Sequence, residues 1–455
     1  MSLVDGADRA PVLAVPPRPA RPLSALALIK MARRNSLAVC DEALFDELFV
    51  ERSFLGQRVV IVSDPAGIKR VLLDNFDNYP RLPQFRRMLE PGLGSGLLAS
   101  EGEVWRRHRR LVAPTIDARA TLPEMSIMTE LTEELARYWA TLPAGGDIDI
   151  GRQIAFLISV AMGRMFAGDD PAVVSMLQCL SKYPRNRRVL DFVPLPLWAR
   201  QLLPESIEKE AHSFDAMLAR LIDERRHPDY AGRHDLIWRL AHAEDRRTGE
   251  KLSAIEVRDE IVTLASGSID TTTRVLTWIW YLLAMHPWAE ARLHAELDEV
   301  LGGRTPAPAD LPRLVYTRKV IDETMRLYPP IPVLMRTAAA DDVICGRRVR
   351  KRSLVGVMPF VVHRHRKLWP NPERFDPERF APENTATRER FSYLPFCLGP
   401  RICVGASLAQ MQVPLIVATL AQRFRYRLVP HHPVTPVGWI TLRPDHGIRV
   451  TLERR

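Results

Sequence analysis

Cys403 is the residue of this sequence whose type and surroundings most clearly predict chemistry. It stands where an apolar, helix-forming run begins, close to two glycines and an arginine. Unpaired N–H groups and the positive end of a helix dipole favour a thiolate there, and a thiolate is a good metal ligand. Gly399 and Gly405 would let the backbone pass close to a flat, bulky group. Arg401 supplies a fixed positive charge for a carboxylate or phosphate.

Two other interpretations of this loop stay open from its residues alone. One is a helix start that carries a buried structural cysteine. The other is a zinc site built from Cys397 and Cys403. Their spacing is not that of a zinc knuckle, and no matching pair of Cys or His residues stands nearby, which weakens the zinc interpretation.

The ten residues from 396 to 405 carry a resemblance to a known family. The pattern Phe-x-x-Gly-x-Arg-x-Cys-x-Gly is filled by Phe396, Gly399, Arg401, Cys403 and Gly405. It resembles the haem-ligand loop of the cytochrome P450 superfamily, the haem-thiolate monooxygenases. The resemblance implies haem b with Cys403 as the axial thiolate ligand of its iron, and the other four residues around the cofactor.

A tryptophan and an arginine four residues apart form a second motif. Trp105 and Arg109 share one face of a predicted helix, and a solvated basic face would explain an isolated run of this kind. Beside the cysteine loop, the pair resembles the Trp-x-x-x-Arg that binds a haem propionate in the superfamily. Arg336, just beyond Pro329 and Pro330, resembles a strand position with the same role.

The elements that position these residues include one long central helix. Ser253 and Glu256 form a capping box, and the helix is predicted to run to Met285, ahead of His286-Pro287. Residues 267–273 gather poor helix formers between apolar flanks. Side chains that compete for backbone hydrogen bonds are expected to distort the helix there and open room for a small molecule. A core helix with an incidental polar patch is the alternative.

The superfamily has Ala-Gly-x-Asp/Glu-Thr at the same place, bending over the haem. Asp270 and Thr271 match the acid and the hydroxyl, whereas Gly267 and Ser268 replace the Ala and Gly. The resemblance implies that Asp270 and Thr271 are catalytic, ordering water and relaying protons. Ser268 adds a hydroxyl where the family usually leaves space.

A helix that ends before Pro329 carries Glu323 and Arg326 on one face, which is a common arrangement by itself. The resemblance implies a structural role, because the family packs this pair against the arginine of a Pro-Glu-Arg-Phe segment and so fixes the cysteine loop. Pro-Glu-Arg-Phe occurs twice here, and the family spacing to the cysteine favours Arg379 over Arg374. Four histidines, His363, His365, His431 and His432, are expected on the surface or in loops.

Length and composition describe an ordinary globular protein. The chain has 455 residues, 46% hydrophobic and 26% charged. We expect a proline-rich, extended lead-in at 1–22 and a single domain at 23–455. With the resemblance, the fold class is mainly α with small β-sheets (α+β), the haem lying between the central helix and the helix after the cysteine loop.

The charge and the cysteine count bound the partners and the compartment. The formal charge of +10 is scattered and no nucleic-acid recognition module accompanies it, so a nucleic-acid role is not expected. An acidic protein partner fits the charge equally well. Five cysteines, an odd number, favour a reducing compartment, and neither a membrane span nor a signal peptide is predicted. We expect a cytoplasmic monomer.

The resemblance implies a monooxygenase that uses O2 to oxidise a small apolar organic substrate. Nothing in the chain resembles a flavin or iron–sulfur module, so electrons are expected from a separate acidic ferredoxin and its reductase, docked on a basic face around residues 106–110 and the cysteine loop. The pocket walls are expected from residues 80–102, 176–204, 264–265, 333–335 and 440. Alternatives are a peroxide-driven haem-thiolate oxidase or isomerase, a non-catalytic haem sensor and a helical interaction scaffold.

Overall fold

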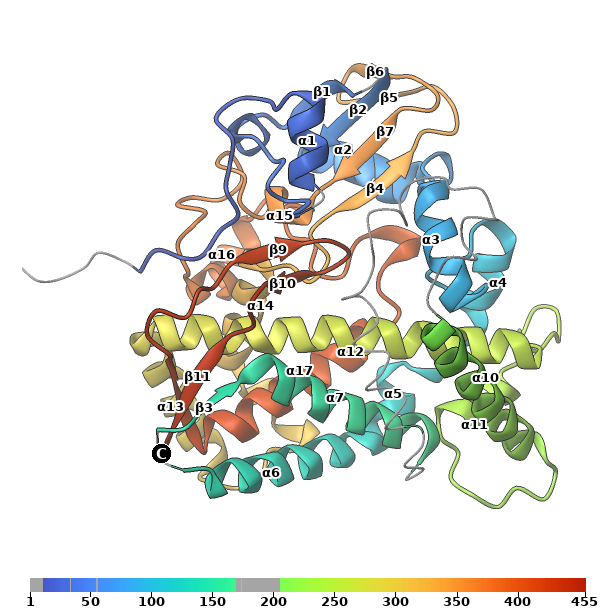
Figure 1. Cartoon of the computed structure of the whole chain (residues 1–455), viewed down its shortest axis with the longest axis vertical. Helices are drawn as coiled ribbons and strands as arrows, with labels where there is room; N and C mark the ends of the chain where they lie inside the picture. Colours follow the sequence, from blue (N-terminus) through green and yellow to red (C-terminus); the bar gives the residue numbers. More distant parts are fainter. Residues whose placement is uncertain (1–10, 33, 55, 144, 169–172, 174–204) are drawn as a thin grey trace, which may run out of the picture.

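Helices dominate the architecture, and small sheets lie toward one side (Figure 1). The structure is a computed structural model that describes residues 11–455 except 33, 55, 144, 169–172 and 174–204. The mainly α fold class with small β-sheets is therefore confirmed. The expected pocket wall at 176–204 lies outside the described residues.

The central helix α12 (Ala254–Met285) crosses the whole molecule, and its bounds are those predicted. The Ser253 hydroxyl accepts the N–H of Glu256, and the Glu256 carboxylate accepts the N–H of Ser253, so the predicted capping box is present. The predicted mid-helix distortion is absent, because α12 is α-helical throughout. The Thr271 hydroxyl donates to the carbonyl of Gly267 at 2.6 Å, which satisfies that hydroxyl without breaking the helix.

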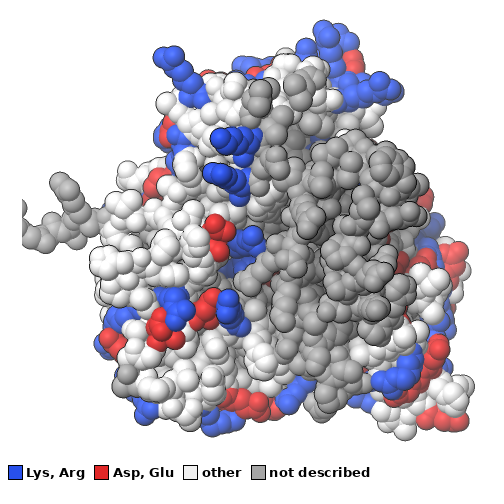
Figure 2. Space-filling model, in the orientation of Figure 1, with Lys and Arg blue, Asp and Glu red and all other residues white. Residues whose placement is uncertain are grey.

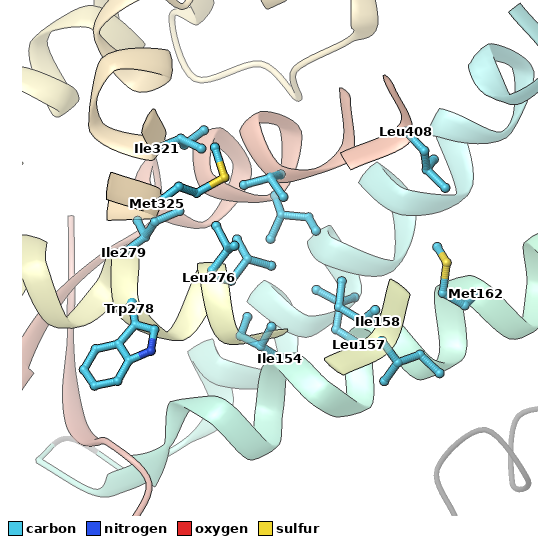
Figure 3. Close-up of a cluster of buried hydrophobic side chains, with 14 of the residues drawn as sticks. Ile154, Leu157, Ile158, Met162, Leu276, Trp278, Ile279, Ile321, Met325 and Leu408 are labelled. Carbon is cyan, nitrogen blue, oxygen red and sulfur yellow. The ribbon is translucent and has the colours of Figure 1, made fainter. Parts of the chain in front are cut away.

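The core forms where α12 packs on α7 (Ile150–Ala167) and α14 (Val315–Leu327). Figure 3 shows Ile154 and Leu157 of α7 pointing toward Leu276 of α12, with Met325 of α14 close by. Burial of these aliphatic side chains holds α12 in place. By length and composition α7 is also apolar enough to cross a membrane, although 61% of it is buried inside the protein.

The helix that follows the cysteine loop is α17 (Ala406–Ala421), which runs into the same core. It packs against α6 (Met125–Thr141) and α12. The other α-helices of the described residues are α1 (Ala25–Ala32), α2 (Pro65–Lys69), α3 (Pro83–Leu93), α4 (Gly102–Val112), α5 (Ala118–Thr121), α10 (Glu205–Arg226), α11 (Leu236–His242), α13 (Pro287–Leu301), α15 (Pro359–Val362) and α16 (Pro382–Thr387).

A four-stranded sheet has the order β1 (Phe49–Phe54), β2 (Gln57–Val62), β7 (Leu354–Val357) and β4 (Leu334–Thr337). Only the β2–β7 pair of this sheet is parallel. Beside it lies the hairpin of β5 (Asp342–Ile344) and β6 (Arg347–Val349). The other strands are β3 (Asp147–Asp149), β11 (Arg449–Arg454) and β8 (Phe424–Leu428) in one sheet, and β9 (Pro436–Gly438) with β10 (Leu442–Pro444) in another.

Part of the proline-rich lead-in is held against the domain. Leu13 is buried, the N–H of Ala14 donates to the Tyr281 hydroxyl, and the Tyr328 hydroxyl donates to the carbonyl of Ala14. Residues 11–22 contain no helix or strand. Long-range hydrogen bonds to α12 and to the end of α14 therefore anchor the extended segment.

Candidate active site

The cysteine loop presents Cys403 three residues before α17 begins at Ala406. The N–H of Cys403 donates to the carbonyl of Phe396 at 2.9 Å, which closes the loop. The Cys403 thiol reaches solvent but is surrounded by many protein atoms, and this desolvation raises its pKa. The Gly405 N–H and the charge of Arg109 act in the opposite direction, but the pKa is raised overall. Burial thus opposes the expected preference for thiolate, and coordination to a cation is what would deprotonate the thiol.

The two glycines of the loop have different surroundings. Gly399 has φ of 72°, and a Cβ there would overlap the backbone carbonyl of Leu72 in a neighbouring helical turn. A Cβ on Gly405 would meet no protein atom within 4 Å. At Gly399 the loop therefore passes close to the protein's own backbone. At Gly405 it borders space that is free of protein atoms.

Arginines gather at a cavity of about 190 Å³ beside the loop. The Arg401 guanidinium lies 3.9 Å over the Trp105 ring, is paired with Glu101, and donates to the carbonyl of Ser100 at 3.1 Å. Burial and the charge of Arg81 lower the pKa of Arg401 to about 9, despite the opposing charge of Glu101. Arg336 is buried at the same cavity, and burial lowers its pKa too.

Arg81 is the cavity residue that sequence reasoning missed. It forms a β-bridge with Arg336 and donates to the carbonyls of Leu97 and Leu98. Burial and the charge of Arg336 lower the pKa of Arg81 to about 10. The available signal was its place directly after Pro80, at the start of a segment already assigned to the pocket wall. Its strand partner, however, lies 255 residues further on and was not predictable.

The cavity therefore fits an anionic group. Four arginines line it with two carboxylates: Asp77 pairs with Arg106 and Glu101 with Arg401, while Arg81 and Arg336 have no carboxylate of their own among the lining residues. Buried cations without enough counter-charge are costly, and a ligand with two carboxylates would relieve them. The two propionates of a haem have this chemistry, and Cys403 supplies the thiolate, so the residues present fit the expected cofactor.

Arg109 lies apart from that cluster, although it shares α4 with Trp105. Its charge acts on the Cys403 thiol, and within the described residues no hydrogen bond or ion pair is made by its guanidinium. The structure thus brings Trp105 together with Arg401, and Arg109 toward Cys403. A propionate contact for Arg109 stays a prediction.

The predicted acid and hydroxyl lie on α12. One carboxylate oxygen of Asp270 is paired with Arg274, and the other accepts the Thr441 hydroxyl at 2.6 Å. Gly267 is exposed although the flanks of α12 are buried, so this part of the helix borders open space. Arg274 and Thr441 were not foreseen. Arg274 stands four residues after Asp270, a spacing that is readable from sequence.

Glu323, Arg326 and Arg379 come together as expected. Arg326 donates to both carboxylate oxygens of Glu323, at 2.6 and 2.7 Å, and Nε of Arg379 is 3.5 Å from one of them. Arg326 also donates to the backbone carbonyls of His363, Pro372 and Arg374. Arg374 contributes this carbonyl and not its guanidinium, so Arg379 is the arginine that faces Glu323.

His363 and His365 lie in the loop after α15, as expected, but both are fully buried and neither is on the surface. Nδ1 of His363 lies 3.2 Å from the carbonyl of Arg326, and Nε2 accepts the N–H of Leu394 at 2.8 Å. Burial and the charge of Arg326 lower the pKa of His363 to about 3, so the ring is neutral. It connects the Glu323–Arg326 network to the start of the cysteine loop.

The basic run at residues 106–110 carries less free charge than expected. Arg106 is paired with Asp77 and Glu103, Arg107 with Glu250 and Glu256, and Arg110 with Asp245. The alternative zinc site also lacks support. No group of three or more His, Cys, Asp or Glu side chains that could hold a metal ion occurs among the residues that the structure describes.

Comparisons with known proteins agree with this site. The family model described as Cytochrome P450 matches residues 17–450. Cyclooctatin synthase of Streptomyces melanosporofaciens is 33% identical over 84% of each chain. Cyclooctat-9-en-7-ol 5-monooxygenase of the same organism is 34% identical over 82% of this chain and 81% of the relative. The solved heme domain of cytochrome P450DA has the same fold, with a TM-score of 0.80, 22% identity and coverage of 98% of both chains.

The matched region contains the cysteine loop, the arginine cavity and the acid–hydroxyl pair. The expected haem cofactor and monooxygenase class are thereby confirmed. The chain belongs to the cytochrome P450 family and is a haem-dependent monooxygenase.

Proposed function

We propose that this enzyme inserts one oxygen atom from O2 into a small apolar organic substrate, with electrons from a separate ferredoxin and its reductase. The observation that carries the proposal is the cysteine loop, which presents Cys403 just before α17 and places Arg401 in a cavity with Arg81, Arg336 and Glu101. Of the two Streptomyces relatives, the second is by name a 5-monooxygenase, which supports a monooxygenation. The name of this relative makes cyclooctat-9-en-7-ol and similar alicyclic alcohols the first compounds to screen.

When bound, the haem supplies the iron centre at which O2 is activated. Cys403 would hold it as thiolate, and Arg81, Arg336, Arg401 and Trp105 would hold its propionates. Arg401 is already fixed over Trp105, so its guanidinium is oriented before a propionate arrives. Fixed cations at the propionates would hold the haem in one orientation.

Proton transfer is assigned to Asp270 and Thr271. Each Asp270 oxygen already has a partner, Arg274 or Thr441, and the Thr271 hydroxyl donates to the Gly267 carbonyl. A proton can pass from an Asp270 oxygen only after the contact at that oxygen opens. Asp270→Asn is expected to slow product formation and to increase the solvent isotope effect, because it removes the proton-carrying oxygen while keeping the size.

Ferredoxin is expected to reach the cysteine loop from its outer side, where Ile402 and Val104 are exposed. Since Arg106, Arg107 and Arg110 are paired within the chain, this contact should depend less on ionic strength than a free basic face would. Turnover measured against salt concentration at fixed ferredoxin tests this. We also propose a monomer in the cytoplasm.

The deciding experiment compares the wild type with Cys403→Ser. The reduced wild-type protein is expected to give the carbon monoxide difference spectrum of a thiolate-ligated haem, and Cys403→Ser to lose it. Incubation with a ferredoxin system and labelled O2 should then place one labelled atom in the product. Product from peroxide alone would favour the peroxide-driven oxidase, and haem binding without turnover would favour the sensor.

A further inference from the structure

The arginine cavity beside the cysteine loop contains a carboxylate that a haem would not need. Glu101 lines this cavity together with Arg81, Arg336 and Arg401, the residues that would hold the haem propionates. The Glu101 carboxylate is paired with Arg401, and its other oxygen, Oε1, is buried without a hydrogen-bond partner in the described part of the chain. Like charges in one cavity repel each other, so an acidic side chain at a site for two propionates needs an explanation.

A role as a helix cap does not explain Glu101. It stands at the N-cap of α4, where a side-chain oxygen commonly accepts an N–H of the first helical turn. The Glu101 side chain makes no such hydrogen bond. It pairs instead with Arg401, which is 300 residues further along the chain. The carboxylate therefore serves the cavity and not the helix.

The charge of Glu101 also acts on the other two arginines of the cavity. Among the described residues neither Arg81 nor Arg336 has an ion pair. Burial lowers the pKa of each guanidinium, and the charge of Glu101 opposes that change at both. Asp77, the other acid at the cavity, is 66% exposed and paired with Arg106. Glu101 is thus the nearest counter-charge for both guanidiniums.

The surface of the molecule does not have this imbalance. Figure 2 shows blue and red side chains next to one another over the lower half of the molecular surface, in contact with solvent. A cation inside a cavity lacks that solvent, and leaving it without a counter-charge is costly. Until haem carboxylates arrive, Glu101 is the group that can meet this need.

We propose that Glu101 takes the place of a propionate before the haem binds. It supplies the counter-charge for Arg401 and its neighbours in the haem-free chain, and it releases Arg401 when a haem carboxylate arrives. The Arg401 guanidinium already lies 3.9 Å over the Trp105 ring, so it is oriented for the propionate. The same carboxylate repels the two propionates and therefore weakens haem binding. The inference rests on the haem and not on the proposed substrate or electron donor.

The test is the rate at which the holoprotein loses haem to an excess of apomyoglobin. Glu101→Gln keeps the size of the side chain and removes its charge. Because the propionates then meet less repulsion, the variant should lose haem about tenfold more slowly, the effect of one charge-assisted hydrogen bond. After haem removal, the full-length variant should unfold about 3 °C below the wild type, since its guanidiniums have lost their counter-charge.

Two controls accompany this variant. Glu103→Gln removes the same charge from the same helix, but the Glu103 side chain is 77% exposed and that of Glu101 only 25%. Water screens the exposed charge, so haem loss and unfolding should match the wild type. The second control is a haem whose two propionates are esterified. It carries no carboxylate for Glu101 to repel, so Glu101→Gln should not slow its loss.

Faster or unchanged loss of haem from Glu101→Gln would overturn the proposal, because Glu101 would then only brace Arg401 in the loaded enzyme. Equal slowing with the esterified haem would show that Glu101 does not act on the propionates. Glu101→Asp covers the case in which the glutamine variant does not fold. It keeps the charge on a side chain one carbon shorter, so it should lose haem no faster than the wild type. Faster loss from this variant would again assign Glu101 a bracing role.

Discussion

Replacing Gly399 by alanine is expected to destabilise the cysteine loop, whereas the same change at Gly405 is not. At Gly399 a Cβ must occupy a backbone with φ of 72° and overlap the carbonyl of Leu72, which is backbone and cannot rotate away. The left-handed conformation costs a non-glycine residue about 1–2 kcal/mol, and forcing an atom into packed structure costs about 1–3 kcal/mol. The expected loss is therefore about 2–5 kcal/mol of unfolding free energy.

The size of the effect in a melting experiment follows from the length of the chain. Unfolding entropy is about 2.1 cal/mol/K per residue, so a protein of 455 residues shifts by about 1 °C per kcal/mol. Gly399→Ala should lower the midpoint by about 2–5 °C when wild type and variant are compared at equal haem content. Circular dichroism in the far ultraviolet follows the transition.

Gly405→Ala is the matched control, because its Cβ meets no protein atom within 4 Å. It should leave the far-ultraviolet spectrum unchanged but reduce haem content, since its methyl group enters the space assigned to the cofactor. A midpoint for Gly399→Ala indistinguishable from the wild type would show that the contact with Leu72 relaxes freely. Full haem content in Gly405→Ala would place the haem elsewhere.

Two further predictions concern buried histidines. His363→Leu leaves the Leu394 N–H without its acceptor, at a cost of about 1–3 kcal/mol; it should lower the thiolate signal in the carbon monoxide spectrum, and His363→Gln, which keeps an acceptor, should restore much of it. Burial lowers the pKa of His108, but hydrogen bonds from its ring to Glu260 and Glu256 outweigh this and raise it overall. The stabilisation of the folded protein by His108 is fully present below the pKa of the histidine in the unfolded chain, about 6.5. It is lost as the pH rises through the higher pKa of His108 in the folded protein. Urea midpoints from about pH 6 to about pH 9 should therefore fall more steeply in the wild type than in His108→Gln; parallel curves would contradict this.

Features that depend on local sequence were predictable here. The bounds of α12 follow from Ser253 and Glu256 at one end and from His286-Pro287 at the other, all within one turn of the helix termini. The ion pair between Glu323 and Arg326 follows from their spacing of three residues along a helix. The loop around Cys403 was identified because its residues lie within ten positions. In each case, neighbours in the sequence are also neighbours in space.

Features that depend on distant partners were not predictable. The charges at Arg107 and Arg110 looked free because their carboxylates stand 149 and 135 residues away, on α12 and just before it. The burial of His363 within its loop was not predictable because the peptide groups that enclose it belong to residues 37 positions before and 31 after. A run of like residues gives the sign of the charge but not the distance to its counter-charge.

The polar stretch of α12 shows why composition alone misjudged the helix. Serine and threonine hydroxyls weaken a helix when they bind backbone groups in competing conformations. In α12 the Thr271 hydroxyl donates to the carbonyl of Gly267 and the Ser268 hydroxyl to that of Ala265, contacts that a continuous helix permits. Asp270 is held from outside the stretch by Arg274 and Thr441. Contacts within α12, together with one from Thr441, thus accompany a regular helix, and any opening beside Asp270 must come from movement of Arg274 or Thr441 and not from a break in the helix.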